Sequence, residues 1–281
     1  MNHPTGDTSI NDGAFFSKPS LVSIITVVYN GSKHLAQAIE SVLAQTYGHI
    51  EYIVIDGGSN DGSVDIIRDY QSHLAYWISE KDRGISHAFN KGIGVATGDI
   101  VGILNADDWY EPAAVETAVL AFAPSIGVVS GGLQCWLGSK KDFIYLPDEQ
   151  QLHREMTVNH PASFVRRSIY QQEGGYQEKY KLAMDYDVML RFKLKGVKFH
   201  TADSVLTNQR LMGVSDRNWL ATRSECLAIK NQLLGRRLSH YLYFWRSVGK
   251  LLVRKTILRL NGERWVAYYR ERYSVVKKVK Q

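Results

Sequence analysis

The run LVSIITVVY at residues 21–29 is rich in β-branched residues and ends at the polar turn Asn30-Gly31-Ser32. Such a run predicts a parallel strand that is buried on both faces. Apolar residues then recur at helical spacing from Leu35 to Leu43, and YIVID (52–56) follows as a second buried strand. A strand, a helix and a strand in this order indicate an α/β fold.

The same alternation continues along the chain. Further strands are expected at 75–80, 99–108, 127–136 and 197–207, further helices at 64–70, 85–96, 112–123 and 184–195, and a β excursion at 142–165. We therefore expect a mainly parallel central sheet flanked by helices, with a ligand site where the strands reach their carboxyl ends.

Composition excludes several classes of protein. The chain has 281 residues, of which 44% are apolar and 22% charged, an ordinary balance for a globular protein. No apolar run approaches the roughly 20 residues of a membrane-spanning helix, and the polar start does not resemble a signal peptide, so a cytoplasmic protein is expected. Cys135 and Cys226 are isolated, which argues against a disulfide framework or a structural zinc site.

Charge divides the chain near residue 216. Residues 1–216 hold 18 Lys and Arg against 25 Asp and Glu, a net charge of −7. Residues 217–281 hold 16 against 3, a net charge of +13. A strongly basic terminal segment favours an anionic partner, either nucleic acid or a phospholipid surface.

The first strand-to-helix turn, Tyr29-Asn30-Gly31-Ser32, lacks GxGxxG, and neither a GxxxxGK[ST] loop nor a GxSxG elbow is present. A nicotinamide-dependent dehydrogenase, a P-loop ATPase and a serine hydrolase are therefore disfavoured. Carboxylates instead follow predicted strands, at Asp56, Asp82 and Asp107-Asp108. Carboxylate oxygens suit Mg²⁺ or Mn²⁺ bridging phosphates. A helix-capping role for Asp107 or Asp108 is the alternative.

Four stretches of the chain resemble family 2 glycosyltransferases of the GT-A fold, in particular bacterial members that assemble O-antigen, capsule and exopolysaccharide. They are SIITVVYNGSKHLAQAIESVLAQTY (23–47), YIVIDGGSNDGS (52–63), SEKDRGISHAFNKGIGVATGDIVGILNADDWY (79–110) and AMDYDVMLRF (183–192). The resemblance covers residues 20–215. It implies an inverting transfer of a sugar from a nucleotide-sugar to an acceptor hydroxyl, with Mg²⁺ or Mn²⁺ as cofactor.

The resemblance also implies residues that bind the nucleotide-sugar. Tyr29 lies where the family holds the base, and Asp56 lies where a carboxylate accepts a hydrogen bond from a pyrimidine N–H, which gives a slight preference for a UDP-sugar. A structural role for Asp56 in the turn before Gly57-Gly58 is equally permitted by its spacing.

Further donor contacts follow from the DRG element. Asp82 and Arg83 match this element beside the nucleotide, and Asn90 and Lys91 match its downstream partner. The resemblance implies that the Arg83 guanidinium stabilises the diphosphate. The alternative is a solvated turn, which is the usual role of an isolated Lys-Asp-Arg. Arg210, before a Gly213-Val214-Ser215 loop that resembles the family's loop over the diphosphate, is expected to reach a phosphate oxygen.

Asn105-Ala106-Asp107 occupies the position of the family's metal-binding DxD motif, with Asn in place of the first Asp. The resemblance makes Asp107 the metal ligand and leaves Asn105 as a neutral oxygen for the ribose or for a metal-bound water. The loss of one negative charge predicts weaker metal affinity, and the role of Asp108 stays open.

Asp185 and Asp187 match the family's acidic pair, which precedes an apolar helical segment. The reaction needs a carboxylate that takes the acceptor's proton, a contribution of about 10² to 10⁴ in rate. Asp185 is the predicted base and Asp187 the reserve, with helix capping as the alternative for either. His160 is expected to bind the acceptor, and a structural hydrogen-bonding role is its alternative.

The basic segment predicts an amphipathic helix over 236–260. One face gathers Leu238, Tyr241, Leu242, Trp245, Leu252 and Leu260, whereas Arg236, Arg246, Lys250 and Arg254 lie away from it and Phe244, Leu251 and Leu258 blur the division. Trp and Tyr beside Lys and Arg suit a helix at an anionic membrane surface. Packing on the body as a solvated bundle is the alternative.

Together these features predict three segments: a loose leader at 1–20, a GT-A catalytic domain at 21–215, and a basic helical region at 216–281. The expected partners are a nucleotide-sugar, a lipid-linked saccharide acceptor and an anionic membrane contacted through 236–281, at the inner face of the cytoplasmic membrane. Nucleic acid is not expected, because the resemblance already supplies a membrane-bound acceptor.

Two other functions remain open. A sugar nucleotidyltransferase would share the α/β body, but it should carry a Gly-rich triphosphate loop where this chain has YNGSKHL (29–35). A non-catalytic module that binds a sugar-nucleotide or a lipid is the other.

Overall fold

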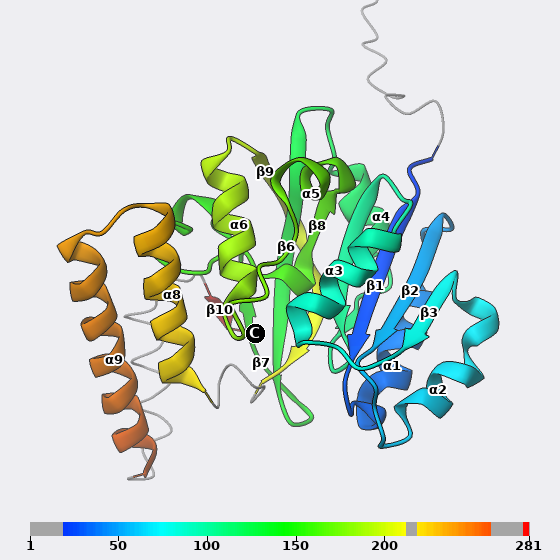
Figure 1. The fold of residues 1–281 in the computed structure, drawn as a ribbon, viewed down its shortest axis with the longest axis horizontal. Helices are drawn as coiled ribbons and strands as arrows, with labels where there is room; N and C mark the ends of the chain where they lie inside the picture. Colours follow the sequence, from blue (N-terminus) through cyan, green and yellow to red (C-terminus); the bar gives the residue numbers. More distant parts are fainter. Residues whose placement is uncertain (1–18, 212–217, 260–277, 281) are drawn as a thin grey trace, which may run out of the picture.

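The structure is a computed structural model that describes residues 19–211, 218–259 and 278–280. Within these residues, a ten-stranded mixed sheet runs through the body with helices on both of its faces (Figure 1). The main path of the sheet is β10-β7-β6-β8-β4-β1-β2-β3, with β9 paired to β6 and β5 paired to β9. Most of the expected leader, the Gly213-Val214-Ser215 loop and Leu260 lie outside the described residues.

The parallel half of the sheet comes from the first part of the chain. It contains β1 (Val22–Val28), β2 (Ile50–Asp56), β3 (Tyr76–Ser79) and β4 (Ile100–Asn105), connected through α1 (Ser32–Leu43), α2 (Ser63–Asp69), η1 (Gln71–His73) and α3 (Ile85–Val95). In the register, Val28 lies opposite Asp56 and Val27 lies opposite Asn105. The polar ends of β2 and β4 therefore meet at one edge of the sheet, on either side of β1.

The second half adds antiparallel pairs, which makes the sheet mixed. Here lie β5 (Trp109–Tyr110), α4 (Ala114–Leu120), β6 (Ile126–Leu137), β7 (Lys140–Tyr145), η2 (Glu149–Gln151), η3 (His160–Ala162), β8 (Ser163–Arg166), α5 (Arg167–Glu173), α6 (Met184–Leu194) and β9 (Lys198–Arg210). β8 runs antiparallel to both β4 and β6, whereas β9 runs parallel to β6. The α/β prediction is confirmed, but the expected mainly parallel sheet is mixed, because β7, β8 and β10 pair antiparallel to their neighbours. Helix α5 is absent from the sequence prediction.

The sheet separates two apolar cores. Within β1, Val22, Ile24 and Val28 pack on the face that carries α1, α2 and α4, while Ile25 and Val27 pack on the face that carries α3, α5 and α6. Every residue of β1 is buried, as the uninterrupted apolar run predicts.

The described part of the basic region consists of the helices α8 (Trp219–Leu233) and α9 (Leu238–Arg259) and of the short strand β10 (Lys278–Lys280), which pairs with β7 and is absent from the sequence prediction. Figure 1 shows α8 between α6 and α9. Ile229 of α8 is fully buried in the core that includes α6. Among the described helices, none has the length and apolar character that crossing a membrane requires.

A partly buried ion pair joins this helical pair to the body. The Glu155 carboxylate accepts hydrogen bonds from Arg223 of α8, at 2.5 Å, and from the Tyr243 hydroxyl of α9, at 2.6 Å. Burial acts to raise the pKa of Glu155, but the charge of Arg223 and these hydrogen bonds outweigh it and hold the pKa below its ordinary value. Both helices therefore contact the same carboxylate, which lies in the loop after η2.

Replacing Glu155 with Gln should lower the free energy of unfolding by about 3 kcal/mol near neutral pH, because Arg223 is left without its counter-charge. A carboxylate with a depressed pKa stabilises the fold above its unfolded pKa and loses that contribution as the pH falls through its folded pKa. The difference from the wild-type chain should therefore shrink as the pH falls from 7 past about 4.5, the ordinary pKa of a glutamate, toward the lower pKa of the folded chain. Urea denaturation across this range measures it.

Asp65→Asn is the matched control, because Asp65 forms an exposed pair with Arg68 on α2. Exposed pairs contribute less than about 1 kcal/mol. A pH-independent difference for the Glu155 variant would contradict the prediction.

Candidate functional site

The side chains of Tyr29 and Asp82 both lie close to Gly57, just after β2. A Cβ atom at Gly57 would lie 2.5 Å from the Asp82 carboxylate and 3.4 Å from the Tyr29 ring, so a larger residue here would displace the Asp82 side chain. The Tyr29 side chain is 68% exposed at this edge, which leaves its ring free to stack on a ligand. The structure thus brings together Tyr29, Asp56 and Asp82, three of the predicted nucleotide residues.

Asp56 is fully buried, and both of its carboxylate oxygens accept hydrogen bonds. The donors are the amides of Gly58 and Ser59, each at 3.0 Å, and the hydroxyls of Ser59 and Ser79 at 2.5 and 2.6 Å. These contacts shape the turn that carries Gly57, so the turn role left open by the sequence is present in the structure.

The other predicted donor residues of this region have partners within the protein. Arg83 makes a two-pronged contact with Glu178, at 2.9 and 2.7 Å, and Lys91 pairs with Glu80 at 2.7 Å. The Asn90 amide donates to the Tyr176 carbonyl and accepts from its N–H. Arg83 remains exposed at the rim, whereas Asn90 has a structural contact that the sequence did not predict.

The two aspartates after β4 have different environments. Asp107 is exposed, whereas Asp108 is buried and accepts a hydrogen bond from the Asn105 amide at 3.1 Å. Burial, reinforced by the charge of Asp107, raises the pKa of Asp108 well above that of an ordinary carboxyl group. Asp107 is therefore the carboxylate of this pair that faces solvent.

The donor atoms at this edge fit a divalent cation. Asn105 Oδ1 and Asp108 Oδ1 are buried and make no hydrogen bond within the described residues. The described residues include no cluster of three or more His, Cys, Asp or Glu side chains suited to a metal. Mg²⁺ commonly uses one or two carboxylates and completes its shell with water and substrate phosphates, so Asp107 with these neighbours is sufficient.

Arg210, at the end of β9, lies beside Asp107. Its guanidinium donates to the Asp107 carbonyl and, at 2.5 Å, to Gln37 of α1, and it lies 4.4 Å from the centre of the Trp109 ring. Burial lowers the pKa of Arg210, but a guanidinium remains charged at neutral pH. Gln37 and Trp109 were missed by the sequence reasoning, because contacts between such distant segments leave no local pattern.

Asp185 lies in the first turn of α6. One carboxylate oxygen accepts the Tyr186 N–H at 2.8 Å, and the other lies 3.7 Å from Nδ1 of His160, with the side chain 25% exposed. His160 belongs to η3, which packs against β4, and its ring lies against Phe89 with centroids 5.4 Å apart. His160 therefore connects the start of α6 to the strand that ends at Asn105.

Asp187, the reserve base, is fully buried and pairs with Arg191 at 2.9 Å. Burial raises the pKa of Asp187, and the charge of Arg191 opposes the shift. A carboxylate with no exposed surface does not reach an acceptor hydroxyl, so the geometry favours Asp185.

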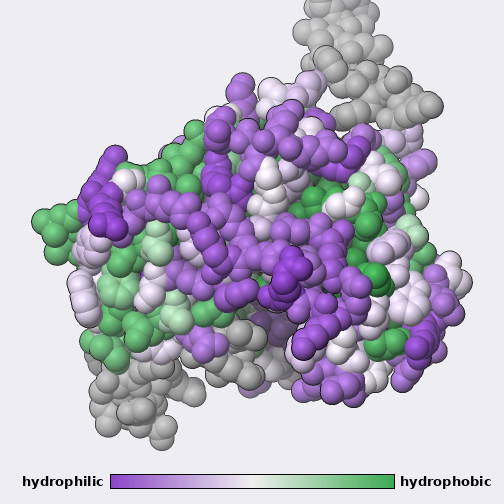
Figure 2. All heavy atoms as spheres, viewed as in Figure 1, coloured by the Kyte–Doolittle hydropathy of each residue, from purple (hydrophilic) through white to green (hydrophobic). Residues whose placement is uncertain are grey.

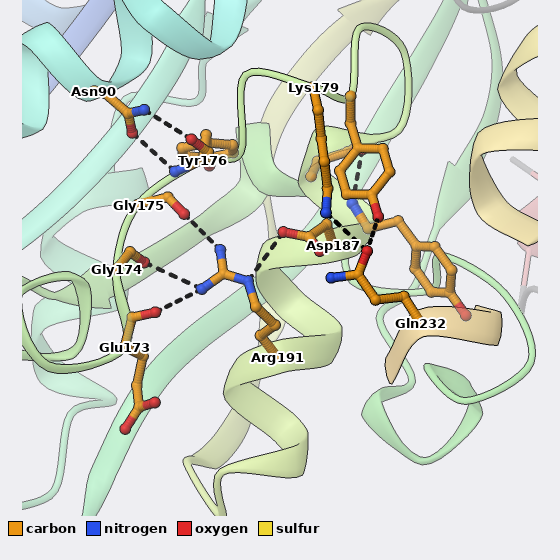
Figure 3. Close-up of polar contacts among 12 residues, drawn as sticks. Asn90, Glu173, Gly174, Gly175, Tyr176, Lys179, Asp187, Arg191 and Gln232 are labelled. Atoms are coloured by element: carbon orange, nitrogen blue, oxygen red, sulfur yellow. Dashed lines mark hydrogen bonds and ion pairs between the residues drawn. The ribbon is translucent and has the colours of Figure 1, made fainter. Parts of the chain in front are cut away.

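The segment from Gly174 to Ala183, called here the 174–183 loop, is held from three helices (Figure 3). Arg191 of α6 donates to the carbonyls of Glu173, Gly174 and Gly175. Asn90 of α3 binds the Tyr176 backbone. Gln232 of α8 accepts hydrogen bonds from the side chains of Lys179, at 2.7 Å, and Tyr180, at 2.9 Å. The loop that leads into Asp185 is therefore fixed along its length.

Arg191→Met should lower the free energy of unfolding by about 3 to 5 kcal/mol, because it leaves Asp187 buried without a counter-charge. It also removes the donors of three carbonyls. Lys193→Met on the same helix is the control, since Lys193 lies 3.9 Å from Glu149 and is partly exposed. Guanidinium chloride unfolding measures both variants, and equal losses would rule out a special role for Arg191.

Comparisons with known proteins agree with this architecture. The model of glycosyl transferase family 2 matches residues 23–170. An uncharacterised glycosyltransferase of Mycobacterium tuberculosis is 35% identical over 180 residues, which cover 62% of this chain and 69% of that protein. Chondroitin synthase of Escherichia coli is 28% identical over 218 residues, which cover 72% of this chain and 30% of the synthase.

Two solved structures share the fold. TarS of S. aureus in complex with UDP-GlcNAc has a TM-score of 0.63 at 16% identity, covering 82% of this chain and 75% of that one. The mannosyltransferase PcManGT from Pyrobaculum calidifontis, in complex with GDP-Man and Mn²⁺, has a TM-score of 0.62 at 17% identity, covering 92% and 77%. The GT-A prediction is confirmed.

Proposed function

The chain belongs to glycosyl transferase family 2, and on that premise we propose that it is a metal-dependent, inverting hexosyltransferase. It moves a sugar from a nucleotide-sugar to an acceptor hydroxyl. The observation that carries this proposal is that exposed Asp107 follows β4 and that His160, the neighbour of Asp185, lies in a helix packed on the same strand. Family membership favours this function over a nucleotidyltransferase or a non-catalytic module.

The donor is a nucleotide-sugar, with a UDP-sugar preferred. The structural neighbours bind UDP-GlcNAc, UDP and GDP-Man, and the exposed Tyr29 ring offers a surface for the base. Asp56 contributes by shaping the turn between Tyr29 and Asp82, because its own acceptor oxygens already have donors. Arg83 at the rim and Arg210 beside Asp107 are the cations proposed for the diphosphate, and Asn90 and Lys91 support the segments around them.

Asp107 would hold Mg²⁺ or Mn²⁺, with Asn105 offering a neutral oxygen and Asp108 lying behind them. A bound divalent ion neutralises charge that develops on the departing diphosphate. Arg210 contributes a second, permanent positive charge at the same place, held there by Gln37 and Trp109.

Asp185 takes the proton of the acceptor hydroxyl as that oxygen attacks the anomeric carbon. Attack from the face opposite the nucleotide breaks the bond to the diphosphate in the same displacement, so the configuration inverts. Neither ring nitrogen of His160 makes a hydrogen bond within the described residues. Both nitrogens are buried, so the proposed contact of His160 with the acceptor is through the part of its side chain that is exposed beside the base.

Asp185→Asn should reduce kcat by about 10² to 10⁴, because an amide does not accept the proton. The KM for the donor should change little, since the residue contacts the acceptor side. Nucleotide release and mass spectrometry of products, with UDP-glucose, UDP-GlcNAc and GDP-mannose plus Mn²⁺, measure both quantities. Asp65→Asn is the control. Wild-type turnover by the Asp185 variant would remove Asp185 from the mechanism, and no turnover of any donor by the wild-type chain would count against the proposed activity.

The acceptor is proposed to be a lipid-linked saccharide in surface polysaccharide synthesis, reached at the inner face of the cytoplasmic membrane. Support comes from α9, which packs on α8 through one face and exposes apolar residues on the other. Val248 is buried in the first face, whereas the exposed face carries Leu238, Tyr241, Leu242, Trp245, Leu252 and Val253. Figure 2 shows hydrophobic residues gathered along α9 at the left edge of the view.

The exposed face of α9 matches the apolar stripe expected from the sequence, and residues 217–281 carry a net charge of +13. Phe244 and Leu251, which blurred that stripe, are only partly exposed, because they lie on the side of α9 that faces α8. An apolar face within a basic segment suits an anionic membrane surface, and this pairing makes a phospholipid bilayer the proposed partner.

Replacing Leu242, Trp245 and Leu252 together by Glu should reduce binding to vesicles that contain phosphatidylglycerol by at least about 100-fold, since each buried apolar side chain contributes about 1.5 to 3 kcal/mol. Co-sedimentation measures the partition coefficient. Leu120→Glu is the control, because Leu120 is an equally apolar and exposed residue on α4. Equal sedimentation of the triple variant and the control would refute membrane contact through α9.

A further inference from the structure

The start of α6 is held by a residue that is distant in sequence. The N-cap residue Ala183 provides no side-chain cap. The Glu225 carboxylate of α8 instead accepts hydrogen bonds from three successive backbone N–H groups, those of Lys181 at 3.0 Å, Leu182 at 2.8 Å and Ala183 at 2.9 Å.

The hydrogen bonds to Glu225 are charge-assisted, and the residues that donate them directly precede the helical turn that carries the proposed base. Hydrogen bonds from N–H groups to a carboxylate are about twice as strong as neutral ones, and a negative charge is favourable at a helix N-terminus. Asp185 follows Ala183 by two residues, so the path of residues 181–183 sets the direction in which the first turn of α6 leaves the loop. Glu225 itself does not contact the reacting groups.

The first of these three residues, Lys181, also contacts the donor edge. The Lys181 ammonium donates to the Arg83 carbonyl at 3.1 Å, and Arg83 in turn binds Glu178 of the same loop. A shift of residues 181–183 therefore displaces the base relative to the place proposed for the diphosphate. Displacements of about 1 Å in such geometry can cost about 100-fold in rate.

We propose that Glu225 is a positioning residue that acts through the 181–183 backbone to hold Asp185 in its productive orientation. Helix α8, which lies beyond the expected catalytic domain at 21–215, is then a part of the catalytic unit. The inference rests on the proposed role of Asp185 as the base.

Glu225→Ala should lower kcat by about 10- to 100-fold and leave the KM of the donor within about threefold, because the donor's own contacts remain. Glu225→Gln keeps the side-chain length and one acceptor oxygen, so its loss should be smaller. The assay is nucleotide release, with Mn²⁺, from whichever of UDP-glucose, UDP-GlcNAc and GDP-mannose the wild-type chain turns over fastest.

Gln232→Ala is the matched control. Gln232 lies on the same helix and holds the same loop, but it binds the side chains of Lys179 and Tyr180 and not the backbone before α6. Hydrogen exchange should show faster exchange at the amides of 181–183 in the Glu225 variants and not in the Gln232 variant. Hydrogen exchange needs no substrate. If the Glu225→Ala chain does not fold, the measurement is made on Glu225→Gln.

A double-mutant cycle separates positioning from general destabilisation. In an Asp185→Asn background, Glu225→Ala should cost less than about twofold, since residues that act as one unit are not additive. Wild-type kcat in both Glu225 variants, or the full loss repeated in the Asp185→Asn background, would overturn the inference. Full activity of Asp185→Asn alone would instead overturn the proposed base.

Discussion

The candidate site depends on the ion pair between Arg191 and Asp187. The carbonyls of Glu173, the last residue of α5, and of Gly174 and Gly175 accept from the Arg191 guanidinium, whose charge is balanced by Asp187 one turn closer to the start of α6. Without this cation those carbonyls would lose their donor, and Asp187 would be buried without a counter-charge, which costs about 3 to 5 kcal/mol. The pair therefore sets the path of the 174–183 loop, and the loop determines where α6 begins and where Asp185 lies.

The chain carries two acidic pairs, Asp107 with Asp108 and Asp185 with Asp187. In each pair one carboxylate is buried and the other is not. At the end of β4, Asp107 faces solvent and Asp108 is buried, with its pKa raised by burial. At the start of α6, Asp185 is partly exposed and Asp187 is buried against Arg191. In each pair the buried residue organises its surroundings, and the exposed residue is available to a ligand.

Much of the parallel half of the fold is predictable from the sequence because β1, β2 and β4 are short, apolar and followed by turn residues. The run at 21–29 alone predicts β1 and its burial on both faces. The antiparallel strands β7 and β8 are less predictable, since pairing direction depends on partners far along the chain. Helix α5 was missed because its seven residues, RSIYQQE, bury a single side chain, Tyr170, and leave no helical repeat.

The site is predictable in its residue types but not in its contacts. Asp56, Asp107 and Asp185 can be found because each follows a recognisable apolar or acidic pattern. The contacts of Asn90 with Tyr176 and of Gln37 with Arg210 join segments that are 86 and 173 residues apart. No local pattern predicts such pairs, so residues that hold the loops cannot be told from solvated ones by sequence alone.

Helix α8 shows why the charge boundary near residue 216 does not separate two independent structures. Its Ile229 completes the core beneath α6, its Arg223 pairs with Glu155, and its Glu225 binds the backbone before Asp185. These side chains project toward the body, while α9 packs on α8 and turns its apolar face to solvent. The surface proposed for the membrane and the carboxylate proposed as the base are thus attached to one helix. The basic segment that begins at residue 217 and the acidic body therefore form one structure.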